Sequence, residues 1–438
     1  MKFAICGVFI VIFQLAAGRA YSEVVSAPTD ANWSIHFQTT TISQGHPGFS
    51  AAYSGTNSLS PSPEFDTSLT STLFLGRRLW HNGQIYFDPE LAGGRGVSST
   101  LGIAGFPNGE IYRVGSSAPE IHVARLYLKQ IFSLGNAREY LHDDENQIRG
   151  YIPVHRITLI AGRFSLSDFF DNNEYSHDPR TQFLNWALMD NGAWDYAADT
   201  TGYTWGVYLS YNEKNWALRL ATAMEPEQAN QMELDTDLRQ AHGDQIEVER
   251  RYHIGKHRGA VRVMYYENHA DMGSYAEVLQ NPVYNMNIVK TRAYRTKYGF
   301  GLNVQQELTH DLGAFGRLGW DDGATESWAF AEIDRTASIG ASLKGANWHR
   351  PADRVGLAAV VNGLSEDHAA YLAAGGYGFM IGDGRLNYAP EEIGEAYYLW
   401  QPFNYLGITA DFQFVNHPAY NKDRGPVYLY ALRLHYEI

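Results

Sequence analysis

The chain has 438 residues, a formal net charge of −14, and frequent Tyr (29), Trp (10) and Gly (42). The acidic balance argues against nucleic acid as a partner, and the excess of aromatic residues and glycine favours all-β structure. Because the only cysteine is Cys6, near the start of the chain, a small secreted domain held by disulfides is excluded. A chain of this length can form roughly two or three soluble domains, or one large barrel.

Residues 1–20 predict a secretory signal peptide that is cleaved near Ala20. Lys2 precedes an uncharged apolar run from Phe3 to Ala17, which is shorter than the roughly 20 residues that a transmembrane helix needs. The alternative, an uncleaved membrane anchor, is therefore disfavoured. We expect residues 21–438 to be exported and to form a single domain.

The rest of the chain is dominated by segments in which apolar and polar residues alternate, the period of two that a β-strand gives. In YLGITADFQF, residues 405–414, every second residue from Leu406 onwards is apolar, while Thr409, Asp411 and Gln413 point the other way. About seventeen such segments are found, and each predicts one strand. They begin near Trp33, Thr72, Gln84, His122, His155, Tyr203, Asn215, Gln245, Val261, Tyr298, Phe315, Ser327, Ser338, Val355, Glu395, Tyr405 and Pro426.

Two long connections interrupt the strands. The first runs from Phe164 to Tyr203 and predicts a short helix over Pro179 to Met189, behind Asp178 as its N-cap. The second runs from Leu364 to Asn387 and predicts a helix around Glu366 to Ala374. Both connections contain more aromatic residues than a solvated loop needs. We therefore expect them to fold inward and to pack against the wall formed by the strands.

Aromatic residues lie at the ends of the apolar stripes. Trp205 and Tyr211 bracket the stripe of one strand, and Tyr428 and Tyr436 bracket that of the last strand. Aromatic rings at these positions are typical of a membrane–water boundary. The opposite faces are rich in Gly, Thr, Asn, Gln, Asp and Arg, which indicates that they are wet.

Together these patterns predict a transmembrane antiparallel β-barrel. In hydrocarbon every backbone polar group needs an internal partner, so an exported chain with such strands must close its sheet. About 16 strands, with 16–18 as the range, fit the length of the chain and leave a water-filled lumen. The alternative is a soluble β-sandwich, because alternation also describes strands with one face on a core.

Charged residues on the wet faces are candidates for the pore lining. Simple solvation of a pore wall would explain each of them singly. The sharper hypothesis is a constriction where Arg and carboxylates face one another and hydrogen bond to sugars, while Trp186 and Trp194 cover the apolar C–H faces of the sugar. The strand candidates are Arg78, Asp88, Glu90, Arg125, Lys129, Glu332 and Asp411.

The sequence lacks the motifs of catalytic, nucleotide-binding and metal-binding sites. It contains no G-x-S-x-G elbow, no Walker loop and no G-x-G-x-x-G in a βαβ setting. The runs HDDE (His142–Glu145) and SHDPR (Ser176–Arg180) contain metal-binding residue types but lack the spacing of a metal site. We expect no enzymatic activity, no cofactor and no metal.

Four blocks of the sequence stand out: FPNGEIYRVG (Phe106–Gly115), FSLSDFFDNNEYSHDPRTQFLNWALMDNGAWDY (Phe164–Tyr196), AYLAAGGYGFMIGDGRLNYAPEEIGEAYY (Ala370–Tyr398) and NHPAYNKDRGPV (Asn416–Val427). They resemble the carbohydrate-selective porin (OprB-type) family of Gram-negative outer membranes. The resemblance implies a 16-stranded barrel in the outer membrane, passive uptake of mono- and oligosaccharides, and inward-folded loops that narrow the channel. By their position in the second block, Arg180, Trp186, Asp190, Trp194 and Asp195 become candidates for the narrowing.

The partners expected from this interpretation are small sugars, outer-membrane lipid and lipopolysaccharide, with no nucleic acid. The chain can be a monomer or a homotrimer. Two alternatives stay open: a general or polysaccharide-export channel with the same fold, and a secreted soluble sugar-binding or hydrolytic β-protein.

Overall fold

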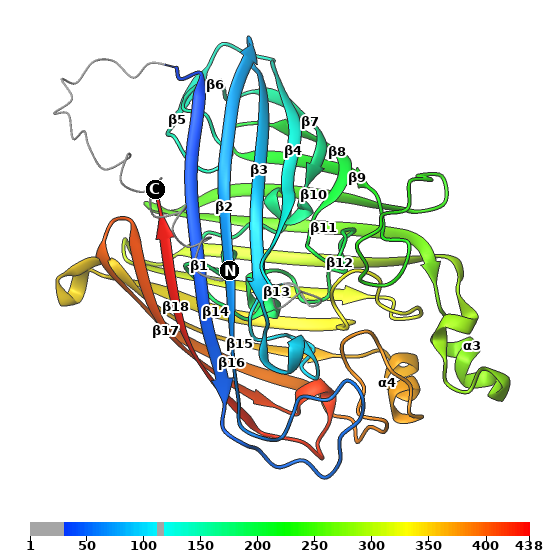
Figure 1. Cartoon of the computed structure of the whole chain (residues 1–438). Helices are drawn as coiled ribbons and strands as arrows, with labels where there is room; N and C mark the ends of the chain where they lie inside the picture. Colours follow the sequence, from blue (N-terminus) through cyan, green and yellow to red (C-terminus); the bar gives the residue numbers. More distant parts are fainter. Residues whose placement is uncertain (1–29, 112–117) are drawn as a thin grey trace, which may run out of the picture.

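The computed structural model describes residues 30–111 and 118–438. Within these residues, sixteen antiparallel strands form one closed barrel (Figure 1). The predicted all-β barrel and its strand number are therefore confirmed. The predicted signal peptide, residues 1–20, lies outside the described residues.

The barrel strands follow one another around the wall in chain order, and in the described part of the chain only one connection contains further strands. That connection joins β4 to β7 and holds a separate hairpin of β5 (Arg138–Leu141) and β6 (Gly150–Pro153). The barrel strands are β1 (Trp33–His46), β2 (Glu64–Trp80), β3 (Gly83–Gly94), β4 (Glu120–Ser133), β7 (Arg156–Phe164), β8 (Thr204–Asn212), β9 (Trp216–Ala223), β10 (His242–Ile254), β11 (His257–Met272), β12 (Ala293–Glu307), β13 (Leu312–Asp321), β14 (Arg335–Gly345), β15 (Arg350–Gly363), β16 (Glu391–Phe403), β17 (Leu406–Asn416) and β18 (Val427–Glu437).

The barrel closes where the last strand meets the first. β18 pairs antiparallel with β1, and Gln38 lies opposite Glu437. Beyond this pair, the N–H of Ile438 donates to the carbonyl of Phe37 and the N–H of Phe37 donates to the carbonyl of Ile438, both at 2.9 Å. The sheet therefore has no free edge along this seam, which a spanning sheet in hydrocarbon requires.

The strands turn their apolar stripes outward. On β14 and β15, Ile339 and Leu357 are 70% and 65% exposed, while their chain neighbours Ser338 and Ala358 are 8% and 5% exposed. A large apolar side chain is costly to leave in water but stable in lipid. The alternation in the sequence therefore separates a lipid-facing surface from a lumen-facing one, as predicted.

The two ends of the barrel differ. At one end the strands are joined by short turns, such as residues 81–82 and 255–256, except for the connection of residues 134–155, and this is also the end where β1 begins and β18 ends. Long connections lie at the opposite end, where α3 (Tyr275–Gln280) and α4 (Glu366–Ala373) are found (Figure 1). In outer-membrane barrels the short turns face the periplasm and the long loops face outside. None of the described helices is long and apolar enough to cross a membrane.

The helix prediction was right for one connection and partly wrong for the other. α4 matches the predicted helix. In the first connection, the helix predicted over Pro179–Met189 is reduced to α2 (Trp186–Met189), whose N-cap is Asn185. Asp178 instead closes a single turn, because its carboxylate accepts the backbone N–H of Arg180 at 3.0 Å.

The strand predicted near Ser327 is wrong. Residues 322–334 are irregular and connect β13 to β14. The backbone N–H groups of three consecutive residues, Trp328 to Phe330, donate to the carboxylate of Asp195 at 2.6, 2.9 and 2.8 Å. These donors are taken by a side chain from another loop, so they do not pair with a neighbouring strand.

Candidate functional site

The connection between β7 and β8, residues 165–203 (loop L3), folds into the barrel. A buried arginine of β13, Arg317, holds it there: Nε donates to Asp171 at 2.7 Å, and the other nitrogens donate to the carbonyls of Ser176 at 2.6 Å and Leu188 at 2.8 Å. A buried loop must find partners for its backbone polar groups. The guanidinium supplies several of these donors at one point.

Two further strands hold L3 in the same way. Arg433 of β18 donates to the carbonyl of Gln182 at 2.9 Å. Glu395 of β16 accepts the N–H groups of Leu184 at 2.5 Å and Asn185 at 2.9 Å. Charges on the wet faces of β13, β16 and β18 therefore anchor the loop to one side of the barrel and leave the lumen on the other side of L3.

The connection from β3 to β4 (loop L2, described at residues 95–111 and 118–119) meets L3 inside the barrel. The N–H of Gly109 donates to the carbonyl of Leu184 at 2.7 Å, and the N–H of Trp186 donates to the carbonyl of Phe106 at 3.0 Å. The two loops thus form one continuous inner surface, and L2 is itself hydrogen bonded to β1 and β2 through Gln44 and Thr70.

An ion pair joins the two loops across this surface. Nε of Arg180, on L3, lies 2.9 Å from the carboxylate of Glu110, on L2, which also accepts the hydroxyl of Thr70. Burial raises the pKa of Glu110, and Arg180 opposes this shift. Although burial opposes ionisation of Asp178 too, Arg180 and Thr181 hold the pKa of Asp178 below its usual value. The guanidinium is thus surrounded by carboxyl groups.

A second group of charges lies on the strand wall. Arg125 of β4 forms a two-point ion pair with Asp168 of L3, with N–O distances of 2.8 and 2.5 Å. Glu90 of β3 accepts the hydroxyl of Thr72 at 2.7 Å and lies 3.1 Å from Nε2 of His122. The wall therefore presents guanidinium donors beside carboxylate acceptors.

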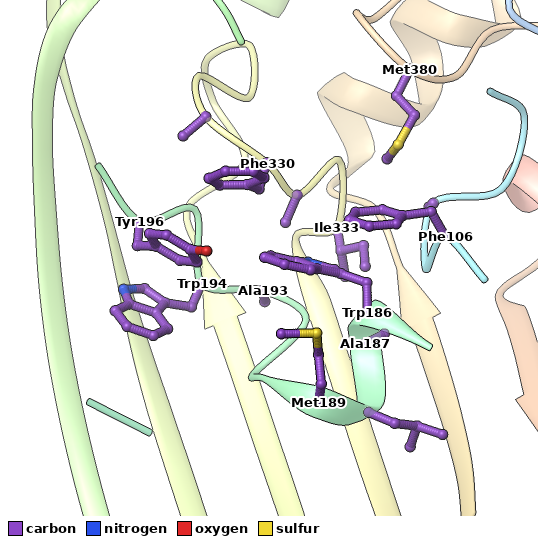
Figure 2. Close-up of a cluster of buried hydrophobic side chains, with 14 of the residues drawn as sticks. Phe106, Trp186, Ala187, Met189, Ala193, Trp194, Tyr196, Phe330, Ile333 and Met380 are labelled. Carbon is purple, nitrogen blue, oxygen red and sulfur yellow. The ribbon is translucent and has the colours of Figure 1, made fainter. Parts of the chain in front are cut away.

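Aromatic rings from three loops cover the inner surface between these charges. Phe106 and Trp186 stack with ring centroids 4.9 Å apart, and Phe330 also stacks on Trp186, at 5.1 Å. Tyr196 lies 4.8 Å from Phe330 and 4.8 Å from Trp194 (Figure 2). Among the described residues, the buried Nε1 of Trp186 has no hydrogen-bond partner.

The ion pairs and several of these rings line one cavity of about 640 Å³ between the loops and the strand wall. A cavity of this size, with aromatic surface and a few convergent polar groups, is typical of a small-molecule site. The arrangement can hydrogen bond a hydroxylated solute and contact its apolar faces. Residues that line it include Glu90, Glu110, Arg125, Arg180, Trp186 and Phe330.

The sequence profile of the carbohydrate-selective porin, OprB family, matches residues 56–437 of this chain. The chain belongs to the OprB family. It is a carbohydrate porin of the Gram-negative outer membrane. The family resemblance of the four sequence blocks is confirmed, and the alternative of a general or polysaccharide-export channel is not favoured.

Solved structures share the fold of this OprB-family porin. The high-pH structure of Pseudomonas putida OprB has a TM-score of 0.71 and 16% identity, and covers 93% of this chain and 94% of that chain. The low-pH structure of the same protein has a TM-score of 0.51 and 12% identity, with coverages of 100% and 98%. The outer-membrane channel DcaP of Acinetobacter baumannii has a TM-score of 0.50 and 9% identity, with coverages of 95% and 100%. Among curated proteins no relative matches.

The residues predicted from the sequence fall into three groups in this porin. Five of them line the cavity and lie around the contact between L3 and the wall of β3 and β4. Three others lie close to the cavity without lining it, and four are buried elsewhere in the barrel or lie near its periplasmic end. The cavity-lining residues are Glu90, Arg125, Lys129, Arg180 and Trp186.

Three of the remaining candidates lie close to the cavity. Asp88 lies behind Arg125, 3.5 Å from its guanidinium. Trp194 is buried in the aromatic cluster, and Asp190 lies 3.2 Å from Nδ1 of His177. These side chains support the surface that L3 presents to the lumen.

Four candidates are placed elsewhere. Arg78 of β2 lies near the periplasmic end, and its Nε donates to a backbone carbonyl at 3.1 Å. Asp195 accepts amides of residues 322–334 and lies 3.5 Å from Lys297. Glu332 lies in that loop rather than on a strand, and accepts two backbone N–H groups at 2.8 Å. Asp411 of β17 is buried, and its carboxylate accepts a hydrogen bond from the side-chain amide of Gln413, on the same strand, at 3.2 Å.

Sequence reasoning did not single out several residues that line the cavity. Phe106 and Glu110 line the cavity, and both belong to the block FPNGEIYRVG. The family resemblance therefore pointed to this loop, although neither residue was predicted as part of the site. Tyr196 ends the second family block but carries no charge, Phe330 lies outside all four blocks, and only the folded loops bring the two rings together. Across the described residues, no group of three or more His, Cys, Asp or Glu could hold a metal ion.

Proposed function

We propose that the cavity between L2, L3 and the strand wall is the constriction through which neutral sugars diffuse, and that its ion pairs and rings recognise them together. The observation that carries this proposal is that the Arg180–Glu110 pair and the stacked Trp186 and Phe330 rings line the same cavity.

The chemistry of a sugar matches both kinds of surface. Its hydroxyl groups donate and accept, so they can bond to the guanidinium of Arg125 or Arg180 and to the carboxylates of Glu90 or Glu110. Its C–H faces are apolar and can lie on a ring such as Trp186. Each contact is weak and can be exchanged for the next, which suits passage rather than storage.

The charge of the cavity supports a preference for neutral over anionic solutes. Carboxyl groups outnumber basic side chains around it, so a sugar acid meets net repulsion as it enters. The acidic residues are Glu90, Glu110, Asp144, Glu145, Asp168, Asp178 and Glu437, and the basic ones are Arg125, Lys129 and Arg180.

The proposed passage includes no chemical step. The solute moves down its gradient, and no bond in it is made or broken. A sugar recovered from the far side of a reconstituted membrane should therefore be chemically unchanged, and hydrolysis of an oligosaccharide during transit would contradict this part of the proposal.

The apolar outer surface of the barrel supports the proposal that it contacts the acyl chains of phospholipid or lipopolysaccharide. Its exposed apolar side chains include Ile339, Leu357 and Tyr430. Such a surface is stable in a bilayer and unstable in water. The assembly is a monomer or a homotrimer, which the mass of the purified protein in detergent distinguishes.

Liposome swelling tests the proposed constriction. Vesicles containing the porin are placed in neutral mono-, di- and trisaccharides and in a sugar acid of monosaccharide size. We expect the neutral monosaccharide to enter fastest and the acid to enter more slowly than its neutral counterpart. Equal rates for the acid and the neutral sugar would overturn the charge-based part, and rates independent of size would overturn the constriction.

A further inference from the structure

The connection from β4 to β7, residues 134–155, is longer than a turn at the periplasmic end requires. Other strands are joined there by two residues, as at 81–82 and 255–256. Ordering each additional residue has a cost in backbone entropy. The extra residues form the β5–β6 hairpin and its tip, residues 142–149 (the exit tip), which lie beside the start of β1 (Figure 1).

The exit tip folds into the mouth of the barrel and is fixed to the inner wall. Nδ2 of Asn146 donates to Asp88 of β3 at 2.9 Å. The N–H of Ile148, which is buried, donates to the hydroxyl of Tyr86 at 3.3 Å. Asp88 and Tyr86 face the lumen, so the tip occupies space inside the barrel rather than solvent beyond it.

The wall of β1 holds the other side of the exit tip. The hydroxyl of Ser34 donates to the carbonyl of Asp144 at 3.2 Å, and Nε2 of His36 lies 3.6 Å from the carboxylate of Asp143. Contacts with both β1 and β3 give the tip a defined position across the mouth.

Glu145 at the exit tip is linked to the constriction through one amide. With the amide of Gln38 oriented so that both its ends are satisfied, its nitrogen donates to Glu145 at 3.0 Å and its oxygen accepts from Nε of Arg180 at 3.0 Å. Arg180 is the cation that pairs with Glu110. The tip therefore lies directly on the periplasmic side of the ion pair between L2 and L3.

The exit tip borders the same cavity as the constriction. Asp144, Glu145 and two further tip residues line the 640 Å³ cavity. A second cavity of about 320 Å³ at the periplasmic end shares Thr181, His435 and Glu437 with it. Glu437, on β18, therefore lies at the boundary between the two cavities. Glu145, on the exit tip, lines the 640 Å³ cavity close to this boundary.

We propose that the exit tip is a second selectivity filter on the periplasmic side, in which Glu437 and the ionised form of Glu145 disfavour anionic sugars and the tip itself limits the size of the solute that leaves. This inference rests on the proposed function, because it assigns a role to the path beyond the same constriction. It treats the hairpin as part of the permeation path rather than only as a structural support for the barrel mouth.

Two variants test the filter. In the first, Glu145→Gln removes one charge and keeps the size and hydrogen-bonding capacity of the side chain. In the second, residues 136–153 are replaced by a two-residue turn. The matched control is Glu139→Gln on the same hairpin, because Glu139 is 47% exposed, pairs with Arg156, and lines neither cavity.

Liposome swelling and reversal potentials in a salt gradient, both measured at pH 9 where the carboxyl group of Glu145 is ionised, provide the readout. We expect Glu145→Gln to raise the rate for a sugar acid severalfold relative to the neutral monosaccharide and to lower the preference for cations, with Glu139→Gln unchanged. The shortened turn should raise the rate for a trisaccharide relative to a monosaccharide. If Glu145→Gln leaves both the acid-to-neutral ratio and the ion preference at the wild-type values, the charge assignment is wrong even when the shortened variant fails to fold.

Failure of this inference is distinguishable from failure of the proposed function. If variants of Arg180 and Trp186 change sugar passage while Glu145→Gln and the shortened turn do not, the constriction stands and the exit filter falls. If only the exit variants change passage, the path crosses the exit tip and selection is not made between L2 and L3.

Discussion

Arg180 and Glu110 lie 2.9 Å apart, and they come from two loops that meet only inside the barrel. Their pairing fixes the relative position of L2 and L3 in the part of the cavity where Arg180 is surrounded by carboxyl groups. The same guanidinium contacts the exit tip through Gln38. One side chain therefore sets the geometry of both the constriction and the path beyond it.

Replacing this guanidinium should weaken sugar recognition and alter ion preference. In Arg180→Ala, loss of charge-assisted hydrogen bonds of about 1.5–3 kcal/mol should weaken sugar block of the channel current by roughly tenfold or more. Cation preference should rise because Glu110 and Asp178 lose their counter-charge. Current recordings with increasing glucose check this, and Arg250→Ala, on the exposed outer face of β10, is the control. Unchanged block would remove Arg180 from the recognition site.

The stacked rings give a second prediction. Trp186→Ala should weaken sugar block by roughly 2-fold to 10-fold, because an aromatic contact is worth about 0.5–1.5 kcal/mol beyond its area. Small-ion conductance should rise as the ring is removed from the cavity. Trp205→Ala is the matched control, because Trp205 faces outward and is 41% exposed. Equal effects of the two substitutions would indicate a general loss of stability rather than a binding contact.

The anchoring of L3 gives a third prediction. Arg317→Met leaves the buried carboxylate of Asp171 and several loop carbonyls without their donor, and breaking a buried pair in this way costs about 3–5 kcal/mol. We expect L3 to detach, with noisier channel current and protease cleavage within residues 165–203. Adding Asp171→Asn should recover part of the loss, because the unpaired charge is removed. A double variant as unstable as the sum of the two single variants would show that the pair is not coupled.

The exit tip predicts a pH-dependent ion preference. Burial in the barrel mouth is the main cause that raises the pKa of Glu145 to about 8; Glu437 and Asp178 add to the shift, and Arg180 and Arg125 oppose it. The carboxyl group is therefore neutral at pH 6 and negative at pH 9. Cation preference, measured by reversal potential, should increase as the pH rises through about 8. Glu145→Gln should abolish this increment, and a variant that keeps the full pH dependence would assign it to other groups.

The barrel itself could be predicted from the sequence because each strand carries its own signal. The period of two in segments such as 405–414 depends only on one face meeting lipid and the other meeting water. Tertiary contacts do not disturb it. The prediction near Ser327 shows the limit, because an apolar alternation there is overridden by Asp195, which takes three consecutive amides of the loop.

The constriction could be predicted only in part. The sequence does not distinguish a charged side chain that lines the water-filled lumen from one that binds the backbone of an inward-folded loop. Glu90 and Arg125 border the cavity, whereas Glu332 and Asp195 accept backbone amides of buried loops. The difference depends on which loop lies over each strand, and this is decided by contacts between residues far apart in the chain, such as Arg317 with Asp171.

The run HDDE (His142–Glu145) contains a lumen residue that the sequence did not reveal. Its spacing argued against a metal site, and no other function could be read from it. The structure places its last residue, Glu145, in the lumen, because the hairpin before and after it turns the tip inward. A short strand pair in a periplasmic connection was not predicted, since four-residue strands carry too little alternation to be recognised.

The seam between β1 and β18 has a consequence for biogenesis. Gln38 and Glu437 must find each other across nearly the full contour of the polypeptide, and such a distant contact is among the slowest to form because a very large loop has to close first. Until that contact forms, the unpaired backbone of two strands is open to pairing with another molecule. The nascent protein therefore depends on being shielded during its transit to the membrane, up to the moment when its two ends join.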